Sequence, residues 1–220
     1  MVTKKISIDE KIRKGNREYA EENSRILSDH GILGVNLMSS PGSGKTSLIE
    51  ATKKWLGERF KLAVIEGDLA GNLDEKRLKS AGIPVVQINT VSMCHLNAFM
   101  VNEVIAELPL SDIDILFIEN IGNLVCPAGL PLGEELRVII LALTEGDDKP
   151  AKYPVIFHDA DAVIINKADL LPYLDVDIEG MKKQLHAINP DVATFIVSAK
   201  NGDGIDKWVN WLTRKVKKAG

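Results

Sequence analysis

Residues 37–48 read LMSSPGSGKTSL and join the end of an apolar run to the start of a helical pattern that continues to Trp55. The order is therefore strand, loop, helix. The pattern G-x-x-x-x-G-K-[ST] fits residues 39–46, except that Ser39 replaces the first glycine. Gly42 and Gly44 let backbone N–H groups turn toward phosphate oxygens, and the helix N-terminus adds about half a positive charge. The segment predicts a nucleotide phosphate loop rather than an ordinary glycine-rich turn.

Two side chains of this loop have predicted chemical roles. Lys45 reaches the β- and γ-phosphates, and Thr46 offers its hydroxyl to Mg²⁺. The loop is expected to bind nucleotide through Gly42, Ser43, Gly44, Lys45, Thr46 and Ser47.

Length and composition exclude several classes of protein. The 220 residues suit one α/β domain with an appendage, and the net charge of −4 argues against general affinity for nucleic acid or anionic membranes. No apolar stretch is long enough to cross a membrane and the N-terminus is charged, so we expect a cytoplasmic protein. Cys94 and Cys126 are then reduced thiols, free for metal or redox chemistry.

Short apolar runs alternate with helical patterns after residue 31. The predicted strands are 35–38, 62–65, 85–88, 113–118, 138–143, 162–165 and 194–197, and the predicted helices are 45–57, 73–81, 95–107, 178–187 and 203–217. Wholly apolar strands separated by helices predict an α/β P-loop NTPase fold, a parallel sheet with helices on both faces. The 113–118 run is nearly all apolar and is expected at the centre of the sheet.

A charged helical pattern at 7–29, ended by Gly31, predicts a helix in front of this fold. The predicted division is an N-terminal helical appendage at 1–30 and a P-loop domain at 31–220, which two loops near the C-terminus assign as a GTPase domain. We expect the helix to pack on the domain; a contact with a partner protein is the alternative.

Two loops near the C-terminus predict guanine as the base. Residues 166–169, NKAD, resemble the N-K-x-D motif of GTPases, in which the carboxylate of Asp169 accepts from both N–H groups of the guanine edge. Residues 198–200, SAK, resemble the loop whose backbone N–H meets the guanine oxygen. The predicted base-binding residues are Asn166, which ties loops together, Lys167, whose stem covers the ring, and Asp169, Ser198, Ala199 and Lys200. GTP is predicted over ATP.

Acidic residues follow two of the predicted strands. Glu119 and Gly122 form E-x-x-G where many GTPases carry D-x-x-G, so Glu119 is expected to bind Mg²⁺ and Gly122 to turn toward the γ-phosphate. Asp68 is expected to hold Mg²⁺ or orient the attacking water; a solvated helix cap is the alternative for either acid. The predicted catalytic residues are Lys45, Asp68 and Glu119, and the Mg²⁺ ligands are Thr46, Asp68 and Glu119. No arginine finger is evident, so slow intrinsic hydrolysis is expected.

Cys94, His95 and Cys126 are candidate ligands for a second metal. Two thiolates and an imidazole suit Zn²⁺ or Ni²⁺. Cys94 and His95 are placed at the start of the predicted helix 95–107, and Cys126 lies seven residues past Glu119. The spacing is not C-x-x-C, so two buried reduced cysteines and a hydrogen-bonded histidine remain the alternative.

The order of these motifs resembles the HypB family, metallochaperone P-loop GTPases of the SIMIBI class that help insert nickel into [NiFe]-hydrogenase. The resemblance covers roughly residues 30–215 and rests on segments 39–46, 66–68, 94–96, 119–127, 144–150, 153–154 and 166–169. The sequence departs from that family at Val91, Asn97 and Phe99, where relatives carry glycine, an acidic residue and, in some, histidine. With four histidines, bulk nickel storage is not expected.

The resemblance implies a GTPase that hydrolyses GTP to GDP and phosphate, with Cys94, His95 and Cys126 binding Ni²⁺ or Zn²⁺ near a nucleotide-dependent homodimer interface. It also implies the hydrogenase large subunit and a HypA-like nickel chaperone as partners, and no nucleic acid or membrane. A UreG-like metallochaperone GTPase and a non-catalytic metal-binding scaffold with a GTPase fold are the alternatives.

Overall fold

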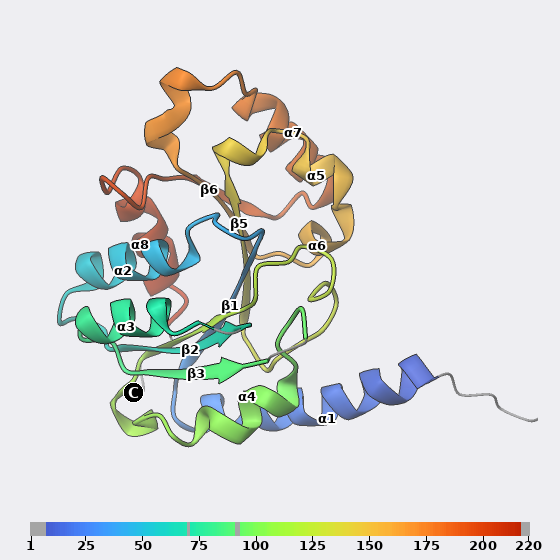
Figure 1. Cartoon of the computed structure of the whole chain (residues 1–220), viewed down its shortest axis with the longest axis vertical. Helices are drawn as coiled ribbons and strands as arrows, with labels where there is room; N and C mark the ends of the chain where they lie inside the picture. The colour runs from blue at the N-terminus through green and yellow to red at the C-terminus, as the bar shows by residue number, and fades with distance from the viewer. Residues whose placement is uncertain (1–7, 70, 91–92, 217–220) are drawn as a thin grey trace, which may run out of the picture.

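The computed structural model describes residues 8–69, 71–90 and 93–216 and is built on one parallel sheet (Figure 1). Its seven strands lie in the order β3-β2-β4-β1-β5-β6-β7. Their bounds are β1 Leu33–Ser39, β2 Leu62–Asp68, β3 Val85–Asn89, β4 Ile115–Glu119, β5 Leu136–Ala142, β6 Ala162–Asn166 and β7 Ala193–Ile196. Every pair of neighbouring strands is parallel. The predicted α/β architecture is confirmed.

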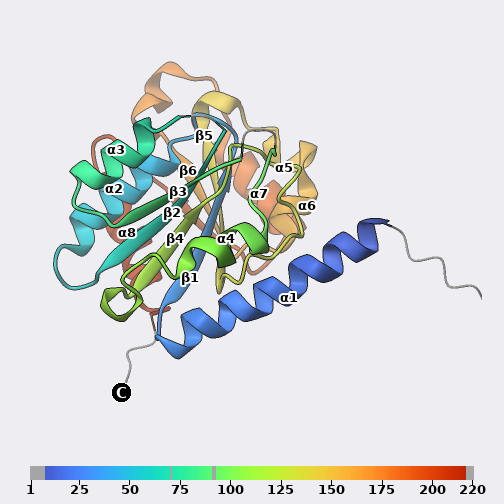
Figure 2. The ribbon, with the colours of Figure 1, turned by 60° about the horizontal axis from the view of Figure 1, so that its bottom comes forward.

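Helices cover both faces of the sheet, as Figures 1 and 2 show. Their bounds are α1 Ile8–Asp29, α2 Lys45–Leu56, α3 Leu73–Ser80, α4 Ala98–Ile105, α5 Lys149–Lys152, α6 Pro154–His158, α7 Ile178–Ile188 and α8 Ile205–Thr213, with 3-10 segments η1 Leu110–Asp112, η2 Leu143–Glu145 and η3 Ala168–Tyr173. Helices α5 and α6 were not predicted, because prolines at 150 and 154 interrupt the helical pattern; each proline lies in the first turn, where a missing N–H is tolerated.

Alternation along the strands explains why they read as continuous apolar runs. In β4, Ile115 and Phe117 face the core that contains α2, α3 and α8, whereas Leu116 and Ile118 face the core that contains α4. Successive side chains of a strand point to opposite faces, so a strand covered on both sides needs apolar residues throughout. The prediction that this strand is central needs a correction: it lies between β2 and β1, and β1 occupies the middle of the sheet.

Helix α4 begins at Ala98, not at the predicted residue 95. The cause is Asn97, whose side-chain oxygen accepts a hydrogen bond from the backbone N–H of Met100 at 2.9 Å and so acts as the N-cap. Cys94 and His95 therefore lie in the loop before the helix. The departure from the family at residue 97 thus has a structural role here.

Helix α1 packs along α4, on one face of the sheet (Figures 1 and 2). It ends at Asp29, and Gly31 caps it as predicted. The N–H groups of Ile32 and Gly31 donate to the carbonyls of Leu27 and Ser28, respectively, and Gly31 has a φ of 67°. Leu27 is buried in the same apolar cluster as β2 and β4. The helix thus shares the core of the domain; the predicted division at residue 30 stays a prediction.

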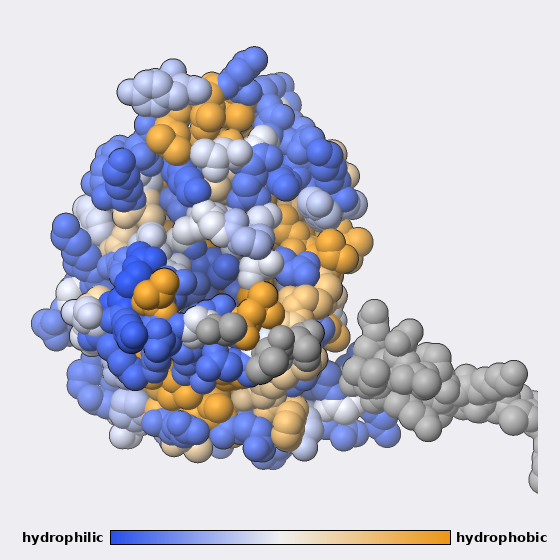
Figure 3. Space-filling model, in the orientation of Figure 1, coloured by the Kyte–Doolittle hydropathy of each residue, from blue (hydrophilic) through white to orange (hydrophobic). Residues whose placement is uncertain are grey.

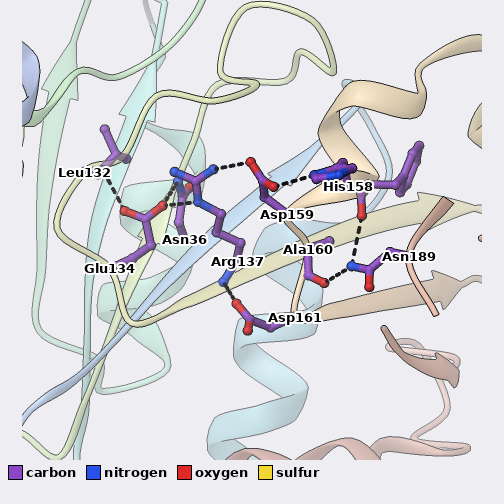
Figure 4. A network of polar contacts seen from close by, with 10 residues as sticks. Asn36, Leu132, Glu134, Arg137, His158, Asp159, Ala160, Asp161 and Asn189 are labelled. Atoms are coloured by element: carbon purple, nitrogen blue, oxygen red, sulfur yellow. Dashed lines mark hydrogen bonds and ion pairs between the residues drawn. The ribbon is translucent and has the colours of Figure 1, made fainter. Parts of the chain in front are cut away.

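A largely buried ion pair fixes the start of β5 (Figure 4). Glu134 accepts from Nε of Arg137 at 2.9 Å and from Nδ2 of Asn36 at 3.3 Å, and the Glu134 side chain is only 2% exposed. The same carboxylate accepts the backbone N–H of Leu132 at 2.6 Å. These hydrogen bonds satisfy both oxygens of Glu134 and so offset the cost of burying its charge. They also hold in place the C-terminal end of the segment between β4 and β5.

On the face seen in Figure 3, polar side chains predominate and apolar ones form several separate patches. One patch near the top lies over the segment that follows β6, in which Leu171 of η3 is 39% exposed. Within the described ranges, no helix is both long enough and apolar enough to cross a membrane.

Candidate functional site

The phosphate loop lies between the end of β1 and the start of α2. Gly42 and Gly44 have φ values of 75° and 96°, in the left-handed region that favours glycine. Lys45 Nζ donates to Ser39 Oγ at 3.2 Å, so the serine that replaces the first glycine of the motif holds the lysine in place. Burial lowers the pKa of Lys45, while Glu119 opposes that shift. The loop therefore presents backbone N–H groups and one buried cation toward the same space.

Two carboxylates face each other beside this loop. Glu66 and Glu119 are paired in the register of β2 and β4, and Thr46 Oγ1 donates to Glu119 Oε1 at 2.9 Å. Burial raises the pKa of Glu119 to about 7; burial and then the charge of Glu119 raise the pKa of Glu66 to about 8. Within the described part of the chain, Oε2 of each carboxylate is buried without a hydrogen-bond partner.

This arrangement fits a divalent cation. Two buried carboxylate oxygens without partners and a threonine hydroxyl are hard oxygen ligands of the kind that Mg²⁺ prefers. The structure brings Thr46 and Glu119 together beside the loop, and their role as Mg²⁺ ligands stays a prediction. Glu66 was missed as a site residue, because only the strand order reveals that it stands opposite Glu119.

Asp68 makes its hydrogen bonds within its own loop. Its two carboxylate oxygens accept backbone N–H groups of its own loop, from Leu69 at 2.6 Å and from Gly71 at 2.8 Å. The residue that faces Glu119 is Glu66 rather than Asp68. A role for Asp68 in holding Mg²⁺ or orienting water stays a prediction.

Two more segments contact the phosphate loop. A Cβ atom on Gly122 would lie 2.8 Å from the backbone of Pro41, so the segment after β4 packs directly on the loop and needs glycine there. Ser43 Oγ donates to Glu145 Oε1 at 2.5 Å, and the same oxygen accepts the N–H of Ala142 at 3.0 Å. Glu145 is a second residue that the sequence assignment omitted, although its segment helped to carry the family resemblance.

Asn166 joins the phosphate loop to the two predicted base-binding loops. Its Nδ2 donates to the carbonyl of Ser43 at 2.9 Å, and its Oδ1 accepts the N–H of Ala199 at 3.1 Å. Asp169 accepts from Ser198 Oγ at 2.7 Å. The predicted tie between loops is thus present.

All the assigned base-binding residues except the buried Ser198 line one pocket. It is lined by Gly44, Ser47, Glu50, Asn166, Lys167, Asp169, Leu170, Ala199 and Lys200. Lys167 has a φ of 64° and is the one non-glycine residue with positive φ in the described ranges. Such backbone strain is concentrated at ligand-binding positions. The pocket opens next to Gly44, so a base placed there is adjacent to the phosphate loop.

Cys94, His95 and Cys126 come together from two different loops. Their ligand atoms all lie within 4.8 Å of one another, and Cys94 Sγ is 3.6 Å from His95 Nδ1. Cys94 is exposed and Cys126 is partly exposed, so the alternative of two buried structural cysteines is wrong. Burial lowers the pKa of His95, which favours the neutral imidazole that binds metal. The donor set fits Zn²⁺ or Ni²⁺.

Side chains nearby shape these two loops. Asn123 Oδ1 accepts the N–H groups of Val125 at 2.7 Å and Cys126 at 3.1 Å, which builds the turn that presents the second thiol. Phe99 packs edge-on against Tyr19 of α1, with ring centroids 5.2 Å apart. Val91, named above for its departure from the family, lies outside the described residues.

Comparison with known proteins identifies close relatives. The CobW/HypB/UreG nucleotide-binding domain family matches residues 34–196. The hydrogenase maturation factor HypB of Azotobacter vinelandii is 47% identical over 210 residues, which cover 96% of this chain and 69% of that protein. Among solved structures, HypB from Archaeoglobus fulgidus is 38% identical with a TM-score of 0.86, over 93% of this chain and 100% of that one. HypB from Helicobacter pylori in complex with nickel is 36% identical with a TM-score of 0.86, over 94% and 99%.

Proposed function

The chain belongs to the HypB family of hydrogenase maturation factors, and from that premise we propose that it is a metal-regulated GTPase that delivers nickel during [NiFe]-hydrogenase maturation. The reaction is hydrolysis of GTP to GDP and phosphate. Nickel is the cargo, held by Cys94, His95 and Cys126; zinc is a second metal that the same donors accept.

One observation supports this proposal most directly: the nucleotide and metal sites share a segment of chain. Glu119 accepts from Thr46 beside the phosphate loop, Gly122 packs on Pro41, and Cys126 follows four residues later with its thiol in the metal cluster. A shift of Gly122 in response to a γ-phosphate would therefore reach Cys126. Nucleotide and metal are then expected to change each other's affinity, and by the same factor.

In this proposal the side chains of the phosphate site position and polarise the nucleotide. Lys45 and the backbone of the loop bind the β- and γ-phosphates. Thr46, Glu119 and Glu66 would hold Mg²⁺, which would supply positive charge to the phosphate oxygens. Asp68 remains a candidate for orienting water. Asp169 accepts from the guanine edge inside the pocket that it lines with Asn166 and Lys200.

The relatives weigh against one alternative and the phosphate site against the other. A UreG-like metallochaperone belongs to the same broad family, but the named relatives that cover most of this chain are HypB proteins. A scaffold without catalysis would not need the buried, partnerless carboxylates beside Thr46. The hydrogenase large subunit, a HypA-like nickel chaperone and a second copy of this chain are the proposed partners, and the proposed location is the cytoplasm.

Phosphate release from GTP tests the enzymatic part of the proposal. We expect turnover with GTP and Mg²⁺ that exceeds turnover with ATP. Lys45→Ala and Thr46→Ala should each reduce turnover by more than tenfold while the circular dichroism spectrum is unchanged, because both side chains act on phosphate and metal ion. Turnover above a tenth of the parent rate in both variants would exclude this phosphate site, and no turnover in the parent would favour the scaffold.

A further inference from the structure

Two asparagines of α1 each bridge the two chain segments that lead to the metal cluster. Asn23 Nδ2 donates to the carbonyl of Ala98 at 2.9 Å and to the carbonyl of Leu132 at 2.8 Å. Asn16 repeats the arrangement: its Oδ1 accepts the N–H of Ala98 at 2.8 Å, and its Nδ2 donates to the carbonyl of Pro131 at 2.8 Å. The two asparagines are seven residues apart, which places them on one face of the helix.

The positions that they hold flank the candidate ligands. Ala98 is the first residue of α4, three residues after His95, whereas Pro131 and Leu132 lie five and six residues after Cys126 in the loop between β4 and β5. The two halves of the cluster therefore come from different segments, one before α4 and one after β4. Helix α1 lies along α4 (Figure 2). Its side chains Asn16 and Asn23 each contact both segments.

Asn16 and Asn23 are themselves held in fixed positions. Asn23 is fully buried and Asn16 is 9% exposed, and Asn102 of α4 donates to Asn23 Oδ1 at 2.9 Å. A Cβ atom on Gly133 would lie 2.5 Å from Asn23 Cβ, so the segment after Leu132 sits directly against α1. Buried amides with all their partners in place have one strongly preferred position, because leaving a carbonyl unpaired in the interior is costly.

We propose that α1 is a positioning element of the metal site: Asn16 and Asn23 hold the Cys94–His95 loop and the Cys126 loop at the separation that lets one metal ion contact both. The inference rests on the proposed role of these three residues as metal ligands. Neither asparagine touches the metal, and both act through the backbone of Ala98, Pro131 and Leu132. Groups hydrogen-bonded directly to metal ligands typically change metal affinity by about 10–100-fold when removed. Because the two asparagines act one step further from the metal, we expect an effect at the lower end of that range.

Metal affinity of matched variants tests the proposal. Asn16→Ala and Asn23→Ala each remove two bridging hydrogen bonds. Asn189→Ala is the control, because it removes a similar bridge within the α6–α7 region. Asn189 Nδ2 donates to the buried carbonyls of Phe157 at 3.2 Å and Ala160 at 2.9 Å. Ni²⁺ and Zn²⁺ affinity is measured by competition with a chromophoric chelator, and GTP affinity with a fluorescent analogue. We expect metal binding to weaken by about tenfold or more in the two α1 variants, with GTP affinity unchanged and the control like the parent.

A metal-free readout separates positioning from general loss of stability. Diamide oxidises two thiols to a disulfide and is itself reduced to the hydrazine. The rate at which it cross-links Cys94 to Cys126 therefore reports how often the two thiols come into contact. The α1 variants should cross-link several times more slowly than both the parent and the Asn189→Ala control. If Asn23→Ala does not fold, Asn16→Asp keeps the acceptor for Ala98 but loses the donor to Pro131, and it should show the same slowing.

The two proposals fail in different ways. A parent protein without metal affinity would overturn the ligand assignment, whereas the cross-linking rates would still decide whether α1 positions the loops. Variants that bind metal as tightly as the parent and cross-link at the parent rate would overturn the positioning role. A control that weakens metal binding as much as the α1 variants would also overturn it.

Discussion

At the scale of single residues, the facing carboxylates of Glu66 and Glu119 determine the electrostatics of the phosphate site. Both are nearly fully buried, and burial keeps the pKa of each well above the ordinary value. A protein core does not retain two such acids for stability, because removing charge from water is unfavourable. Their retention beside Thr46 is consistent with binding a cation that compensates the charge.

The folded-state pKa of Glu66, about 8 against an ordinary 4.5, predicts how stability depends on pH. Between those values the folded protein binds more protons than the unfolded chain, so the free energy of unfolding falls as pH rises from about 5 to 8. Glu66→Gln removes this loss and should stabilise the nucleotide-free protein at pH 8 by a few kcal/mol, since each pKa unit is worth about 1.4 kcal/mol. Urea denaturation at pH 5.5 and 8 measures it; equal pH dependence in parent and variant would contradict the assignment.

A substitution at Asp169 is expected to change the base preference of the nucleotide site. Asp169→Asn replaces an acceptor with a mixed donor and acceptor, which should weaken GTP binding by about 2–5 kcal/mol because a charge-assisted pair is lost. The same change should favour xanthosine triphosphate, whose ring has a carbonyl where guanine has an amino group. Ser198→Ala, which removes only the hydroxyl that donates to Asp169 at 2.7 Å, is the milder control. Unchanged GTP affinity in the Asn variant would make the guanine assignment wrong.

At the scale of elements, the successful predictions are those that depend on local sequence pattern. All seven strands and the phosphate loop were found because apolar runs and glycine positions report burial and backbone shape directly. The start of α4 was missed by three residues because the cap at Asn97 overrode the helical pattern. Two features left no local signal in the sequence. The pairing of Glu66 with Glu119 depends on the strand order. The hydrogen bonds from Asn23 to Ala98 and Leu132 depend on backbone partners far along the chain.

Gly122 predicts how the segment after β4 communicates with the phosphate loop. Its φ lies outside the left-handed region, so alanine fits the backbone, but a Cβ would meet Pro41 at 2.8 Å. Gly122→Ala should therefore push the segment off the loop. A non-hydrolysable GTP analogue should then no longer change metal affinity, so the ratio of the affinities with and without it should be close to one. Metal titration with and without the analogue measures this. Gly15→Ala, where a Cβ has open space, should keep the full effect, and a normal effect in Gly122→Ala would contradict the coupling.

At the scale of the whole molecule, the count of ligands argues for a dimer. One chain offers Cys94, His95 and Cys126, which is one ligand short of a closed four-coordinate site. A two-fold interface duplicates each ligand, so the two chains together offer six ligands. Four of these are enough for one metal ion shared across the axis. Cys94 is exposed and its loop lies at the molecular surface, which leaves it accessible to a second copy.

Cys126→Ser should abolish metal-dependent dimerisation and leave GTP binding largely unchanged, because the serine hydroxyl is a poor ligand for a soft site, whereas Asp169 lies in a separate pocket. Binding needs deprotonated thiols, so the metal affinity of the parent should fall as pH is lowered and protons compete. Sedimentation velocity of parent and variant, with each combination of metal and non-hydrolysable GTP analogue, measures the assembly. A parent that stays monomeric with both ligands, or a serine variant that dimerises with metal as well as the parent, would rule out a metal shared between two subunits.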